Sequence, residues 1–279
     1  MSTPDLTLPL ATILQKVTFK THKTVANSLG AIALVSGRLP KDQYIRYLMM
    51  LWHIYSTFEP ALEQHATHPT LEPIYNPAVL ARSLSLSADI AYLLDVPEAS
   101  WKSHPIHLAL LKDTPLVLKA YVNRVRELAE AQDPSPLLGH VYVRYLGDLS
   151  GGQTVRRAIV KAYGLDGKSG EGLSFYTFKE LESTKKGMQG ELKHIKEWFR
   201  DGMNKAGERG NDVKASVIGE ANTAFDLNIE LFDAINAELD EGMKMKTYQS
   251  YQVIAAIALV CLFFWCSSTV ASHEWTLRR

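Results

Sequence analysis

The chain has 279 residues, of which 46% are hydrophobic and 22% charged, so it can bury a sizeable globular core. Its 30 basic residues balance 30 acidic ones, and this neutral balance argues against a nucleic-acid-binding protein. Both cysteines, Cys261 and Cys266, lie in an apolar run near the C-terminus, which excludes a disulfide framework, a cysteine-based zinc site and a thiolate nucleophile elsewhere.

The N-terminal part of the chain has helical periodicity and no secretory signal. Residues 1–10 lack the basic and apolar regions of such a signal, so we do not expect export. After Pro40 and Asp42, apolar side chains recur at alternating spacings of four and three, which places them on one helical face. These side chains are Tyr44, Leu48, Leu51, Tyr55, Phe58 and Leu62. Pro60 is predicted to bend or end this helix near residues 56–59.

Two further helices are predicted along the chain. One covers residues 116–128 and has Pro115 in its first turn, and the other covers residues 213–239. Neither a strand-like alternation of apolar and polar residues nor an internal repeat is found in the sequence. Stretches rich in turn-forming residues predict loops at 132–136, 164–172 and 205–212. The sequence therefore predicts an all-α fold.

The C-terminal region is predicted to be a transmembrane tail anchor. The sequence carries no charge from Thr247 to Ser272, and residues 251–271 can cross a hydrocarbon core of ~30 Å as a helix. The alternative is a buried core helix. We expect the endoplasmic reticulum membrane, or else the mitochondrial outer membrane, with the large domain in the cytosol. The predicted division is a domain at 1–243, a juxtamembrane linker at 244–250, the span at 251–271 and a short tail at 272–279.

The segment His140–Gln153, HVYVRYLGDLSGGQ, is predicted to be helical although it contains three glycines. Each glycine costs a helix ~1 kcal/mol relative to alanine, so some other interaction must offset this cost. One explanation is that a flat ligand approaches the backbone closely, at a helix that can kink there. The other is tight helix–helix packing, and the spacing alone favours neither. Arg144 and Asp148 are one turn apart and can hold each other beside such a ligand.

This segment resembles the signature of the haem oxygenase family, and four other segments match that family in order. They are THKTVAN (21–27), WHIY (52–55), SGEGLSFYTF (169–178) and TAFDLNIELF (223–232). The resemblance implies a single compact multi-helix domain that clamps haem b between a proximal and a distal helix. It also implies that haem is both cofactor and substrate. O2 and electrons from NADPH–cytochrome P450 reductase would convert haem to biliverdin, ferrous iron and carbon monoxide.

The resemblance also implies roles for individual residues. His22 would ligate the iron, with Thr18 one turn earlier on the same helix. One turn later the chain has Ala26, where animal members carry a glutamate. The remaining pocket residues would be Tyr142, Lys196 and Arg200 at the haem propionates, together with Phe225 and Asn228.

On the distal side, the resemblance implies a catalytic group centred on Asp148. This carboxylate would organise the distal water, and Tyr55 and Arg144 would support it. Gly147 and Gly151 would line the distal face of the haem. A neutral imidazole on one face and a carboxylate-held water on the other suit oxygen chemistry directed at the porphyrin itself.

Two other functions stay open at this point. A haem-binding sensor or buffer without turnover would share His22 but would tolerate loss of Asp148. A tail-anchored helical scaffold would bind no haem. Among the other histidines, His53 is expected to be a hydrogen-bonded core residue. The pairs His65/His68 and His104/His107 are expected at the surface, because no third metal ligand accompanies either pair.

Overall fold

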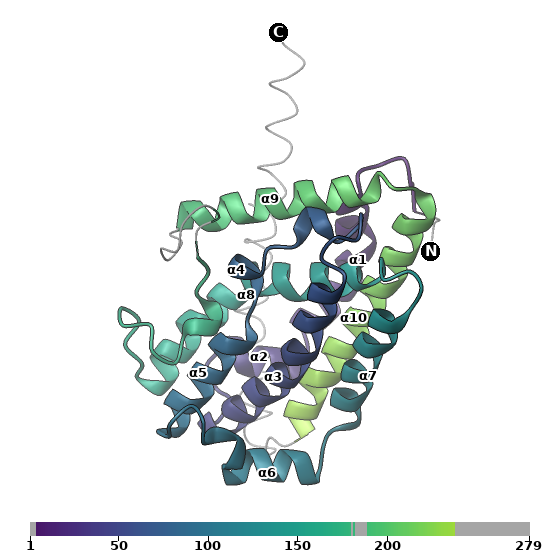
Figure 1. Ribbon diagram of the computed structural model, residues 1–279. Coiled ribbons are helices and arrows are strands. Elements are labelled where there is room, and N and C mark those ends of the chain that lie inside the picture. Colours follow the sequence, from purple (N-terminus) through teal and green to yellow (C-terminus); the bar gives the residue numbers. More distant parts are fainter. Residues whose placement is uncertain (1–3, 180, 182–188, 238–279) are drawn as a thin grey trace.

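The structure, a computed structural model, describes residues 4–179, 181 and 189–237. Within them it contains ten α-helices, three short 3-10 helices and no β-strand, which confirms the predicted all-α fold (Figure 1). The α-helices are α1 (Leu10–Ala26), α2 (Leu29–Val35), α3 (Lys41–Gln64), α4 (Pro77–Leu80), α5 (Ser83–Leu94), α6 (Pro105–Lys112), α7 (Leu116–Glu130), α8 (Leu137–Tyr163), α9 (Gln189–Gly207) and α10 (Asn211–Ala237). The predicted linker, transmembrane span and tail lie outside the described residues.

Helix α3 confirms the predicted apolar face and shows that, of the two effects predicted for Pro60, a bend or an end, the end does not occur. All six apolar side chains of that face are buried. The helix does not end before Pro60 but continues to Gln64. Proline removes one backbone hydrogen bond from the helix, but Ala61 and Leu62 in the following turn are buried in the core. We attribute the continuation of the helix to this packing.

Helix α10 packs against α1, α2, α7 and α8. It therefore joins the N-terminal helices to α8, which carries the segment His140–Gln153. Two glycines permit the close contact. A Cβ added at Gly139 of α8 would lie 2.6 Å from the backbone nitrogen of Ala221, and one at Gly30 of α2 would lie 2.2 Å from the carbonyl oxygen of Phe232. In Figure 1, α9 lies across one end of this bundle and α6 across the other. Tertiary packing of α10 therefore brings segments from both ends of the domain together.

The predicted loops are found with one change. Residues 132–136 and 164–172 connect helices, as predicted. The loop predicted at 205–212 is shorter, because α9 ends at Gly207 and α10 begins at Asn211.

One stretch in the described part of the chain, Pro77–Leu94, is long and apolar enough to cross a membrane. It comprises α4 and α5, and half of it is buried inside the domain. Arg82, at the junction of the two helices, is buried and donates hydrogen bonds to the carbonyl oxygens of Leu80 and Val79. Core helices share this apolar character, so the stretch is weak evidence for a membrane span.

Candidate active site

The predicted proximal residues lie on α1 and α10. The rings of His22 and Phe225 meet edge to face, with centroids 6.1 Å apart and planes at 82°. His22 is exposed, yet the surrounding protein lowers the pKa of its imidazole by desolvation. This combination places an accessible, neutral imidazole at the protein surface, which is the form that ligates a metal.

Phe19 is a further residue of this face that the sequence analysis did not assign to the pocket. It lies one turn before His22 on α1, and 51% of it is exposed although it is strongly apolar. A large exposed apolar side chain beside an accessible imidazole is consistent with a hydrophobic ligand covering both. The helical spacing of three residues to His22 was the signal available in the sequence.

The sequence left two explanations for the glycines of α8, close approach of a ligand and tight packing inside the protein. The structure assigns different glycines to each. A Cβ added at Gly147 or Gly151 would meet no atom within 4 Å, so the backbone is open to an approaching ligand there. A Cβ at Gly152 would lie 3.2 Å from the Tyr176 ring, so this glycine serves internal packing. The helix is α-helical throughout the segment. Close ligand approach is therefore the better explanation for Gly147 and Gly151.

A buried hydrogen-bond network lies directly beside these open glycines. The Tyr55 hydroxyl donates to Oδ2 of Asp148, and Arg144 donates from Nε to the Tyr55 oxygen at 3.4 Å. Arg144 also donates from Nη1 to Oδ1 of Asn228. The structure thus brings together all three predicted catalytic residues with Asn228, using α3, α8 and α10. Tyr55 links Arg144 to Asp148.

The charges in this network follow from burial and from neighbouring groups. The pKa of Asp148 is raised, because burial outweighs the lowering effects of Arg144 and of the Tyr55 hydrogen bond. Burial disfavours the charge on Arg144, but the neighbouring Tyr55, Tyr121 and Asp148 outweigh this and raise its pKa. Arg144 therefore remains a cation in the protein interior, where it favours the ionised form of Asp148.

The predicted propionate-binding residues form a second group on α1, α8 and α9. Burial raises the pKa of Tyr142, while a side-chain hydrogen bond with Thr18 and the charge of Arg200 lower it. Lys196 and Arg200 lie one turn apart and are both partly buried. Burial lowers the pKa of both, and the charge of Arg200 further lowers that of Lys196. Two neighbouring, partly desolvated cations favour the binding of an anionic group.

His53 and the histidines of the two predicted pairs are engaged in internal hydrogen bonds. His53 is partly buried, and its Nε2 lies 3.0 Å from Nε2 of His107, which confirms the prediction for His53. His107 was predicted at the surface and is instead 4% exposed, with Nδ1 2.7 Å from the carbonyl oxygen of Lys102. The described residues contain no group of three or more potential metal ligands. His65 and His68, also predicted at the surface, are partly buried, and Nε2 of His65 lies 2.7 Å from the carbonyl oxygen of Ala129.

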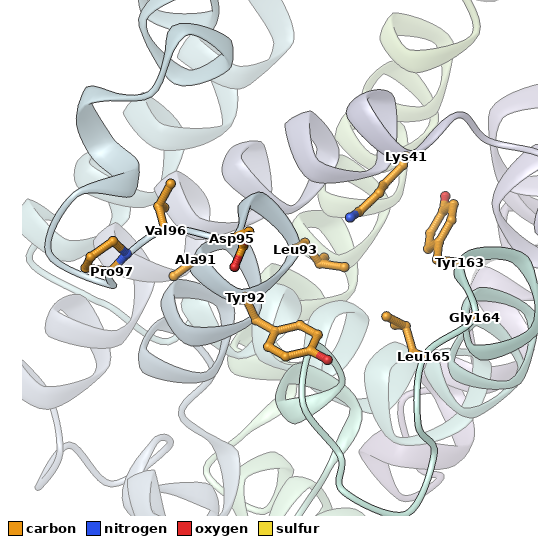
Figure 2. Close-up of a pocket in the computed structure, with 10 residues that line it drawn as sticks. All are labelled: Lys41, Ala91, Tyr92, Leu93, Asp95, Val96, Pro97, Tyr163, Gly164 and Leu165. Atoms are coloured by element: carbon orange, nitrogen blue, oxygen red, sulfur yellow. The ribbon is translucent and has the colours of Figure 1, made fainter.

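A separate cavity of about 610 Å³ lies near the end of α5 (Figure 2). Tyr92, Asp95 and Leu165 are among its lining residues, and Lys41 extends toward it from α3. None of the residues lining it belongs to the predicted haem site. The cavity is therefore distinct from the site described above.

Comparisons with known proteins agree with this geometry. A family model described as heme oxygenase matches residues 8–234. Heme oxygenase 1 of Homo sapiens is 33% identical over 235 residues, which cover 84% of this chain and 74% of that protein. Heme oxygenase 1 of Bos taurus is 32% identical over 243 residues, which cover 86% of this chain and 77% of that protein.

Solved structures show the same similarity in three dimensions. The crystal structure of heme oxygenase-2 from Synechocystis sp. in complex with heme and NO has a TM-score of 0.73 at 29% identity, covering 87% of this chain and 93% of that one. Heme oxygenase from Leptospira interrogans has a TM-score of 0.68, also at 29% identity, covering 81% and 100%. The open backbone at Gly147 and Gly151 and the accessible imidazole of His22 agree with these similarities. Because the family model matches most of its length, this chain belongs to the haem oxygenase family.

Proposed function

We propose that this enzyme cleaves haem to biliverdin, ferrous iron and carbon monoxide, using O2 and electrons from a reductase. The observation that carries the proposal is the open backbone at Gly147 and Gly151 beside the buried carboxylate of Asp148. That arrangement offers space for a flat ligand next to a group able to hold water and protons.

The residues present fit haem b. Bound haem supplies an iron that binds O2 and a porphyrin ring that is itself oxidised. His22 would ligate the iron, because its lowered pKa keeps the imidazole neutral and able to coordinate a metal. Phe19 and Phe225 provide apolar contacts. Lys196 and Arg200 would provide the charge-assisted hydrogen bonds that propionates require.

Asp148 is assigned the role of holding a water on the distal side. Tyr55 donates to its Oδ2, and we assign the other carboxylate oxygen to this water. Arg144 keeps the Tyr55 oxygen in place, so that the tyrosine proton points to the carboxylate. A fixed acceptor beside bare backbone can orient a water and exchange a proton with it.

We further propose that NADPH–cytochrome P450 reductase supplies the electrons. A tail anchor at residues 251–271 would place both proteins on the same membrane and raise their encounter frequency. The endoplasmic reticulum, with the catalytic domain in the cytosol, is the membrane that we propose. The mitochondrial outer membrane is the alternative.

The test is addition of hemin to the purified protein, followed by NADPH and the reductase, with absorbance spectra recorded over time. The proposal expects a haem complex that is replaced by biliverdin, with release of carbon monoxide. A haem spectrum that persists without biliverdin would support a haem sensor or buffer. If hemin gives no complex, or if His22→Ala leaves the spectrum unchanged, the scaffold alternative gains support.

A further inference from the structure

The 3-10 helix η3 (Ser174–Tyr176) lies within the segment SGEGLSFYTF, and Asp89 of α5 binds its backbone. The backbone N–H groups of Ser174 and Phe175 donate to Oδ1 and Oδ2 of Asp89, each with an N···O distance of 2.8 Å. The Asp89 side chain is fully buried. Burial raises the pKa of this carboxyl to about 6, against the lowering effect of the two hydrogen bonds. The group is therefore ionised at neutral pH, where both of its oxygens accept.

Arg82, directly before α5, binds the same segment through its carbonyl oxygens. Its Nη1 donates to the carbonyl oxygen of Thr177 at 2.8 Å and to that of Phe175 at 3.3 Å. Its guanidinium carbon lies 4.3 Å from the centroid of the Phe178 ring. Burying an acid and a cation is costly unless their polar atoms have partners. Both groups use the backbone of one segment, so Asp89 and Arg82 together fix its position.

The fixed segment also contacts α8 and α3. Nε2 of Gln153 donates to the carbonyl oxygen of Tyr176 at 2.8 Å. The Tyr44 hydroxyl donates to the Tyr176 hydroxyl at 3.2 Å. On α8, the Tyr176 ring covers the glycine at position 152, where an added Cβ would lie 3.2 Å from it. Contacts from three helices, α3, α5 and α8, therefore hold η3.

The Phe175 ring joins η3 to the distal network. It meets the Tyr55 ring edge to face, with centroids 6.0 Å apart and planes at 65°, and both side chains are buried. The Tyr55 ring also contacts the Tyr145 ring, at a centroid separation of 5.8 Å, and the Arg144 guanidinium, at 5.3 Å. A functional side chain keeps its geometry when packing fixes its rotamer. Phe175 is thus one wall of the space that orients the Tyr55 hydroxyl toward Asp148.

We propose that Asp89 is a positioning residue, which acts through η3 and the Phe175 ring to keep the Tyr55 hydroxyl on Asp148. Each step of this path is a direct contact, namely two hydrogen bonds to η3, one ring contact and one hydrogen bond to the distal carboxylate. The inference rests on the proposed function only where it concerns haem turnover. The position of Tyr55 belongs to the haem-free protein and can be tested there.

Asp89→Asn is the decisive variant. It keeps the size of the side chain but replaces one acceptor oxygen with an NH2 group, which cannot accept from a backbone N–H. In haem-free full-length protein, the amide exchange of Ser174 or Phe175 should accelerate by about tenfold. Exchange of the Tyr55 hydroxyl proton, followed by ¹³C NMR of labelled tyrosine, should accelerate by a similar factor. The Tyr121 hydroxyl on α7, 3.2 Å from Nδ1 of His140, is an internal reference and should exchange at its wild-type rate.

Asp95→Asn is the matched control, because it makes the same acid-to-amide change directly after the end of α5. Asp95 is exposed and has a φ of 55°, a conformation that asparagine tolerates. This variant should leave all of these exchange rates unchanged, and a result that matches Asp89→Asn would contradict the proposal. The proposal is also wrong if Asp89→Asn accelerates the amides but not the Tyr55 hydroxyl, or if it accelerates the Tyr121 hydroxyl equally.

Phe175→Leu covers the case in which Asp89→Asn does not fold. It keeps an apolar side chain and the backbone hydrogen bonds to Asp89 but removes the ring that meets Tyr55. Exchange of the Tyr55 hydroxyl should accelerate, while the Ser174 amide should exchange as in wild type. Unaltered Tyr55 exchange would overturn the proposal.

Haem turnover separates a positioning role from a purely structural one. With hemin and reductase, Asp89→Asn should lower kcat about tenfold at unchanged hemin affinity. When Tyr55→Phe is already present, the same substitution should change kcat by less than about twofold, because the hydroxyl that it positions is absent. Equal losses in both backgrounds would contradict the proposal. A wild-type protein that makes no biliverdin would count against the proposed function, and the exchange rates would then decide this inference by themselves.

Discussion

Alanine at Gly147 is predicted to stabilise the haem-free protein and weaken haem binding. The added Cβ meets no protein atom within 4 Å, so the substitution introduces no clash. Alanine favours an α-helix over glycine by ~1 kcal/mol, which corresponds to a rise in Tm of about 2–4 °C for a domain of this size. The same methyl group occupies the space that we assign to haem. Overpacking of about 1–3 kcal/mol would weaken hemin binding by roughly fivefold to 150-fold.

The measurements are thermal unfolding of haem-free protein by circular dichroism and hemin titration followed by absorbance. Gly219→Ala on α10 is the matched control, because a Cβ there also meets nothing within 4 Å. It should raise Tm by a similar amount and leave hemin affinity unchanged. Gly139→Ala should instead destabilise, since its Cβ would lie 2.6 Å from a backbone nitrogen. A Gly147→Ala protein that is more stable and binds hemin normally would refute the assignment of the open face to haem.

The remaining predictions concern the distal acid, the cations, pH and the tail. Asp148→Asn should retain the haem spectrum but lose biliverdin formation, because the carboxylate that holds the distal water is gone; normal yield would contradict its role. Lys196→Gln combined with Arg200→Gln should weaken hemin binding, measured by titration, by roughly tenfold or more. Glu220 contributes about 3 kcal/mol of stability above pH 4.5, which is lost as pH falls from 4.5 towards 2; urea unfolding at a series of pH values should show this loss in wild type and not in Glu220→Gln. Removal of residues 248–279 should leave a soluble, active domain; loss of haem binding on truncation would contradict the predicted domain division.

Local sequence patterns predicted helices, and the resemblance to the family supplied the site residues. The apolar face of α3 follows from residues three and four apart, and contacts within one helix need no knowledge of the rest of the fold. The site residues were assigned by resemblance, and the structure brings Tyr55, Arg144, Asp148 and Asn228 into one network. The transmembrane span stays a prediction.

Long-range packing determined where α3 ends and which glycines face open space. Proline disfavours the interior of a helix, yet α3 continues past Pro60 because the turn that follows it is buried in the core. Sequence periodicity does not reveal this packing. For the glycines, spacing allowed either ligand approach or helix packing. Only the neighbouring elements distinguish Gly147, which faces open space, from Gly152, which packs on Tyr176.

The segment His140–Gln153 by itself predicted a helix that carries three glycines, because propensity and spacing are local properties. The side-chain partners of His140 are Glu220, which lies 80 residues away on another helix, and Tyr121, 19 residues before it. A buried histidine takes its tautomer from the groups that surround it. Those groups meet only when α7, α8 and α10 pack together, so the tertiary structure alone decided the partners of His140.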